Sequence, residues 1–97
     1  MFVILTSKPG QFRTELGEGM RRIEAYDYLF CGRRRAQFVI AQIEGEAKVK
    51  IVDEASPAAV NLVPSKFLPR FDSLEKARRE LASLAACGGI DVSLERI

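Results

Sequence analysis

The strongest pattern of apolar and polar positions lies between residues 20 and 43, where two long strand-like segments flank a glycine-containing turn. Side chains alternate in character through both segments, which is typical of strands with two different faces. The turn falls within residues 31–34, and Gly32 can adopt the positive φ that a tight hairpin requires. If Gly32 and Arg33 are its central pair, one face carries Tyr26, Tyr28 and Phe30, and the other carries Ala36, Phe38 and Ile40.

The segments on either side of this hairpin are shorter. Residues 2–6 form an unbroken apolar run, which predicts a strand covered on both faces. Residues 11–19 are polar and contain two glycines, so we expect a loop. Residues 47–53 alternate cleanly and predict a third strand that continues the hairpin as a meander. Residues 60–71 are apolar but contain two prolines, which predicts an edge strand or an extended cover.

A helix is the clearest element of the C-terminal third. Asp72 is a suitable N-cap, and apolar side chains then recur at helical spacing. We expect one buried face of Leu74, Ala77, Leu81, Leu84 and Ala85. The glycine pair at 88–89 ends the helix, and residues 90–97 alternate enough to form a final short strand.

These elements predict one α+β domain over residues 1–97. We expect a small antiparallel sheet of four to five strands, a meander with a long central hairpin, packed by one C-terminal helix and completed by a final short strand. One helix can cover only one face of such a sheet. The other face therefore needs sheet curvature, the proline-containing segment or another molecule to cover it.

Composition narrows the class of protein. The chain has 97 residues, is 47% hydrophobic and 29% charged, and carries a net charge of +2, which is ordinary globular composition. It has no apolar run long enough for a membrane span or a signal peptide, so we expect a cytoplasmic protein without membrane contact. Cys31 and Cys87 are far apart and not in a CxxC pair, which favours free thiols.

The candidate chemistry is sparse. The chain has no histidine, which excludes Ser/His and Cys/His nucleophilic arrangements. Two thiols are too few for a zinc or iron–sulfur site within one chain, so we expect no metal and no cofactor. Asp27 stands out because its neighbours on the same side of the strand are Ala25 and Leu29, and we expect an arginine or a backbone bulge to compensate it. The sequence thus favours a non-enzymatic protein.

The hairpin is the candidate binding surface. Residues 20–35 contain five arginines against Glu24 and Asp27, so their local charge is +3. Our predicted binding residues are the aromatic stripe and the arginines after the turn: Tyr26, Tyr28, Phe30, Arg33, Arg34 and Arg35. Tyrosine, phenylalanine and arginine are enriched in protein interfaces, which predicts a small adaptor that binds another protein or itself as a homodimer.

Two alternatives remain at this point. The same aromatic and arginine side chains could stack bases and hold phosphates, which would make the chain an RNA or single-stranded DNA binding protein. A domain that binds a small ligand between helix and sheet is the third possibility, and it requires a pocket of a few hundred Å³, roughly the lower end of the usual range.

Overall fold

The fold was analysed in a computed structural model that describes residues 1–56, 59–86 and 91–97. It confirms the α+β class, with antiparallel strands, one C-terminal helix and a final short strand. The elements in chain order are β1 (Phe2–Ser7), β2 (Phe12–Glu15), β3 (Met20–Phe30), β4 (Arg33–Ile43), β5 (Lys48–Asp53), β6 (Val60–Pro64), the 3-10 helix η1 (Ser65–Phe67), β7 (Arg70–Phe71), α1 (Leu74–Ala86) and β8 (Val92–Arg96).

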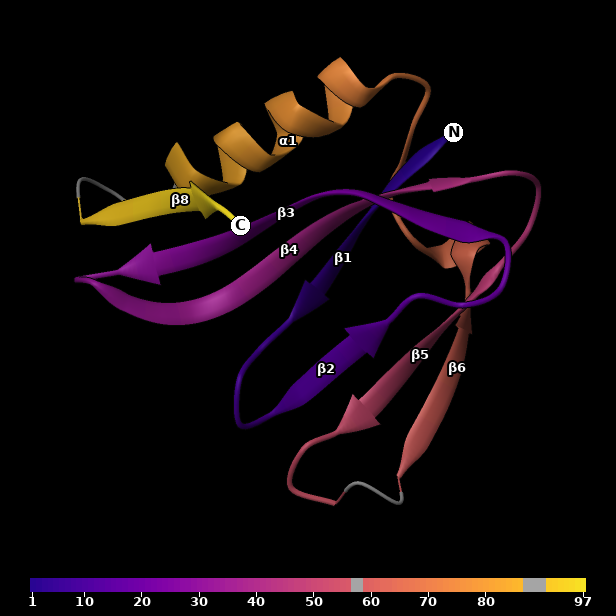
Figure 1. The fold of residues 1–97 in the computed structure, drawn as a ribbon, viewed down its shortest axis with the longest axis horizontal. Helices are drawn as coiled ribbons and strands as arrows, with labels where there is room; N and C mark the ends of the chain where they lie inside the picture. Colours follow the sequence, from indigo (N-terminus) through magenta and orange to yellow (C-terminus); the bar gives the residue numbers. More distant parts are fainter. Residues whose placement is uncertain (57–58, 87–90) are drawn as a thin grey trace.

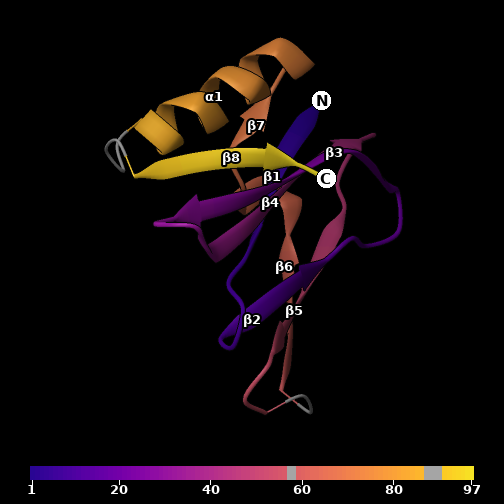
Figure 2. The same cartoon turned by 60° about the vertical axis from the view of Figure 1, so that its left-hand side comes forward.

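The strands form two sheets (Figure 1). Five of them pair in the order β7-β1-β4-β3-β8, and three pair in the order β2-β5-β6. The helix lies along one face of the five-stranded sheet, and the three-stranded sheet lies on the other side (Figure 2). The five-stranded sheet is therefore the middle layer, with the hairpin β3–β4 at its centre.

The predicted meander is wrong at its third strand, because β5 does not pair with β4. Each strand has two edges, and β4 uses one for β3 and the other for β1. The N-terminal strand thus occupies the position that the meander assigned to β5. A turn at Gly45, where φ is 72°, sends the chain into the second sheet instead.

The predicted loop at residues 11–19 is also partly wrong. Residues Phe12–Glu15 form β2, which pairs antiparallel with β5. The polar residues of this segment led to the prediction of a loop. Arg13 and Glu15 are compatible with a strand here because β2 is an edge strand that faces solvent. The chain then turns back at Gly17, where an added Cβ would lie 1.7 Å from the carbonyl oxygen of Lys48, so only glycine fits there.

The hairpin turn lies one residue earlier than the assumed central pair. Cys31 and Gly32 both have positive φ, at 52° and 75°, and Phe30 pairs with Arg33. This register brings Tyr26 opposite Phe38 and Tyr28 opposite Ala36. The expectation that these residues lie on different faces of the hairpin is therefore wrong.

A bulge in β3 fixes which face the aromatic stripe occupies. Arg22 pairs with Ala41 and Glu24 pairs with Ile40, so Ile23 is an extra residue between them. Such a bulge re-aims the side chains that follow it. Glu24 and the residues in step with it consequently point toward the helix.

Two apolar clusters lie on opposite faces of the five-stranded sheet. The helix side is built on the buried residues Ile4, Ile40, Ala77 and Leu81. The side toward the second sheet is built on Val3, Leu5, Ala41, Ile43, Ala47 and Val49. Residues of β1 contribute to both clusters, which confirms the strand predicted to be covered on both faces.

The helix begins one residue later than predicted. Ser73 is the N-cap, because its Oγ accepts a hydrogen bond of 3.2 Å from the amide of Lys76, while Asp72 instead forms an ion pair with Lys76. Leu84, predicted to be buried, is 43% exposed. The predicted end of the helix at the 88–89 glycine pair, and Cys87, lie outside the described residues.

Candidate functional site

The predicted aromatic stripe is only partly accessible. Tyr26 packs into the cluster beneath the helix. Tyr28 is half-buried and meets Phe38 edge to face, with ring centroids 5.9 Å apart. Phe30, the last residue of β3, is 38% exposed. The stripe therefore offers one exposed aromatic ring at the tip and not a continuous platform of three.

Three arginines follow the turn, and the first of them, Arg33, lies directly opposite Phe30 in the hairpin. Arg33, Arg34 and Arg35 are all exposed. One guanidinium nitrogen of Arg34 lies 3.8 Å from Oδ1 of Asp27, which is the arginine partner that the sequence predicted for this carboxylate. Cys31 is a free, exposed thiol in the turn itself. The tip thus brings together four of the six predicted binding residues.

The tip is held by the last strand. β8 pairs with β3 as far as Phe30, which lies opposite Val92. The amide of Cys31 also donates a hydrogen bond of 2.9 Å to the carbonyl oxygen of Asp91. These contacts restrict the motion of the tip, so a partner that binds there has less conformational entropy to remove.

A buried charge cluster on the helix side was missed by the sequence analysis. The side chain of Glu24 is 1% exposed, and its Oε1 accepts a 2.5 Å hydrogen bond from Nε of Arg78 on the helix. Its Oε2 accepts a hydrogen bond from the hydroxyl of Tyr26 and lies 3.7 Å from the guanidinium of Arg96 on β8. One carboxylate therefore links β3, the helix and the last strand.

The pKa values in this cluster follow from its geometry. Burial by itself would raise the pKa of Glu24, but the hydrogen bonds from Tyr26 and Arg78 and the nearby guanidinium charges outweigh it, so the pKa lies below 4.5. Burial raises the pKa of Tyr26, and the hydrogen bond to the carboxylate of Glu24 raises it further. The hydrogen bond to Glu24 raises the pKa of Arg78. The carboxylate is thus held ionised, which suits a structural link better than an acid catalyst.

An apolar cavity of about 350 Å³ lies between β1, the second sheet and the helix. Its lining is mostly apolar and includes Ile4, Leu5, Phe12, Ile51 and Leu84. The hydroxyl of Thr14, another lining residue, donates its hydrogen bond to the carbonyl of Thr6. The cavity has the volume required for a small ligand, but few polar groups face it.

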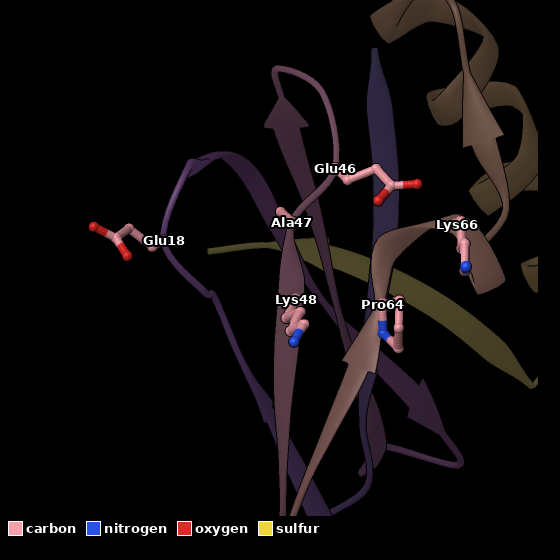
Figure 3. A pocket seen from close by; sticks show the side chains of 6 residues that line it. All are labelled: Glu18, Glu46, Ala47, Lys48, Pro64 and Lys66. Atoms are coloured by element: carbon pink, nitrogen blue, oxygen red, sulfur yellow. The ribbon is translucent and has the colours of Figure 1, made fainter.

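A second hollow, of about 510 Å³, lies at the start of β5 (Figure 3). Lys48 and Lys66 lie on either side of Pro64, whereas the carboxylate of Glu18 points away from them (Figure 3). These charged groups do not converge on one point. We therefore assign no chemistry to this hollow.

Other classes of site have little support in the part of the chain that the structure describes. Within residues 1–56, 59–86 and 91–97, no group of three or more His, Cys, Asp or Glu side chains is placed to hold a metal ion. None of the helices in those ranges has the length and apolar character needed to cross a membrane.

Comparisons with known proteins add no function. No protein-family model matches the chain, and neither a curated protein nor a solved structure matches it. Over the described residues, the fold is α+β, with two antiparallel sheets and one α-helix. Function must therefore be argued from its own surfaces.

Proposed function

We propose that this chain is a non-enzymatic, cytoplasmic adaptor that binds another protein through the tip of its central hairpin. The tip surface consists of Phe30, Arg33, Arg34 and Arg35. The observation that carries the proposal is that Phe30 is 38% exposed at the end of a strand held by β8, and that the turn after it leads into three exposed arginines. An aromatic anchor with arginines around it is the composition that interface centres favour.

Tyr26 has a different part in this proposal from the one predicted. It packs under the helix and donates a hydrogen bond to Glu24. Tyr26 therefore stabilises β3 on the helix side and does not contact the partner. Tyr28 supports Phe38 in the same way. The binding surface is accordingly smaller than the six residues suggested by the sequence, and it is displaced toward the turn.

Site-specific cross-linking tests the proposal. A photoreactive phenylalanine analogue replaces Phe30 in the native host, and the same analogue at Ile97, which is 55% exposed, is the matched control. We expect one protein to be cross-linked from position 30 and not from position 97. With that protein purified, Phe30→Ala should weaken binding at least about tenfold, roughly 1.4 kcal/mol, and Ile97→Ala should leave it unchanged.

Two outcomes would contradict the adaptor function. Equal cross-linking from both positions would show that the tip has no preferred partner. Binding of a mixed oligonucleotide that weakens steeply with salt and with substitution of the three arginines would favour the nucleic-acid alternative. In that alternative the arginines could still bind phosphates, but Tyr26 packs under the helix and cannot stack on bases.

A further inference from the structure

The outer strands of the two sheets differ in how they avoid pairing with other chains. In the five-stranded sheet, β7 is only two residues long, and β8 ends in Glu95 and Arg96. In the three-stranded sheet, β2 carries Arg13 and Glu15. Short length and charged side chains are the usual protection of a sheet edge. The other edge of that sheet, β6, has the sequence VNLVP and contains no charged residue.

The free hydrogen-bonding groups of β6 can be assigned from the bonds at its two ends. The carbonyl of Ala59 accepts from the amide of Asp53, and the amide of Ser65 donates to the carbonyl of Ala47. Groups on an antiparallel strand alternate in direction, so the odd-numbered residues between them also face β5. The amides of Val60 and Leu62 therefore point away from β5, to the side where no further strand of the described residues joins the sheet (Figure 1).

The side chains at these outward positions are apolar and exposed. Val60 is 46% exposed and Leu62 is 60% exposed. Pro64, the third outward position, has no amide proton and offers only its carbonyl. Within the described residues, the edge thus combines two free donors, three free acceptors and apolar side chains over five residues.

We propose that β6 pairs antiparallel with β6 of a second copy of this chain, about a two-fold axis at Leu62. In this register the amide and carbonyl of Leu62 bond to those of Leu62 in the second copy, and each Val60 amide bonds to the opposite Pro64 carbonyl. Every outward amide of the strand then has a partner, and the proline needs none. The two three-stranded sheets become one sheet of six strands.

Self-complementary apolar side chains favour a second copy as the occupant. The pairing sets Leu62 beside Leu62 and Val60 beside Pro64 on one face, so apolar groups meet apolar groups. Lys66 follows the strand and lies beside Pro64 (Figure 3). An antiparallel pair places the two copies of Lys66 at opposite ends, separated by more than the Debye length of roughly 8 Å.

Sedimentation equilibrium over a range of concentrations tests this interface, with Leu62→Lys as the variant and Leu84→Lys as the matched control. Leu84 is 43% exposed on the helix, so both substitutions place a lysine at an accessible leucine. We expect the wild-type chain to dimerise and Leu62→Lys to weaken the dimer at least about tenfold, because two lysines then meet on the axis. Leu84→Lys should dimerise like the wild type.

Amide hydrogen exchange of the wild-type chain gives a second readout that needs no variant. The amides of Asn61 and Val63 face β5 and should exchange slowly at any concentration, whereas those of Val60 and Leu62 should become slow only as the dimer forms. A monomer at about 1 mM, equal weakening by both lysine variants, or a foreign chain paired with β6 would each overturn the proposal. Phe30→Ala should leave the dimer intact, so this interface is tested separately from the hairpin tip.

Discussion

The two acidic residues of β3 lie on opposite faces of the five-stranded sheet and differ in their hydrogen-bonding partners. On the helix face, the carboxylate of Glu24 is buried and bonds to Tyr26 and Arg78. On the opposite face, Oδ1 of Asp27 is also buried but has no hydrogen bond among the described residues, and Arg34 lies 3.8 Å away. We therefore expect the two acids to contribute differently to stability, because, within the described residues, only Glu24 has hydrogen-bonding partners placed against its carboxylate.

The two faces of the five-stranded sheet also differ in how completely they are covered. The helix face is filled along its length by side chains from residues far apart in the sequence, with Arg78 reaching across to Glu24. On the opposite face, the second sheet packs on β1 and the base of β4. The two surfaces that we propose for partners, the hairpin tip and the edge of β6, both lie outside these packed regions.

The largest expected effect tests how the helix closes its face. Leu81→Ala should lower the free energy of unfolding by about 2–5 kcal/mol, because Leu81 is 2% exposed and its truncation leaves a cavity. Leu84→Ala, one turn further along, should cost less than about 1 kcal/mol because that side chain is 43% exposed. Urea denaturation measures both. Equal losses would show that the helix packs on the sheet along a different face.

The next effect concerns the buried carboxylate. Glu24→Gln should lower the free energy of unfolding by about 2–3 kcal/mol, because it removes the charge from hydrogen bonds made to Arg78 and Tyr26. Glu75→Gln is the matched control, since that side chain is 79% exposed and its 4.0 Å pair with Arg79 should contribute less than about 0.5 kcal/mol.

The pH dependence of the stability difference between the wild type and Glu24→Gln shows whether the charge of Glu24 causes it. The pKa of Glu24 is lower in the folded chain than the ordinary value of 4.5, so its contribution is complete above about pH 4.5. It is lost as the pH falls through the folded-state value. The gap in stability between the wild type and Glu24→Gln should therefore narrow at acid pH. A gap that is the same at every pH would mean that packing, and not charge, stabilises this position.

The sequence was sufficient for the class of fold and for most of the elements. Strong alternation between residues 20 and 43, and helical spacing from Leu74 to Ala85, depend on local patterns that tertiary structure seldom reverses. The strand order was not accessible in the same way. Whether β5 follows β4 depends on whether the N-terminal strand already occupies that edge, and this is a long-range competition that no local pattern records.

The candidate site was predicted in part. The three exposed arginines were predicted from their place after the turn, and Phe30 was predicted as the last member of the aromatic stripe. Tyr26 and Glu24 did not, because the bulge at Ile23 turns them toward the helix and no residue type specifies a bulge there. A usable signal was present, since Glu24 is in step with Tyr26 and Tyr28 along the strand. A carboxylate in an aromatic stripe predicts a basic partner from another element.

The smallest expected effect tests the open face. Asp27→Asn should leave the free energy of unfolding unchanged or raise it by up to about 1 kcal/mol, because the buried Oδ1 makes no hydrogen bond to the described residues that the substitution would remove. Asp53→Asn is the matched control, because Oδ1 of Asp53 accepts hydrogen bonds from the amides of Ala55 and Ser56. This substitution should lower the free energy of unfolding by about 0.5 kcal/mol. Thermal denaturation at neutral pH measures both. If Asp27→Asn instead destabilises the chain as much as Glu24→Gln, then Arg34 compensates Asp27 as fully as Arg78 compensates Glu24, and the two faces do not differ in the way described.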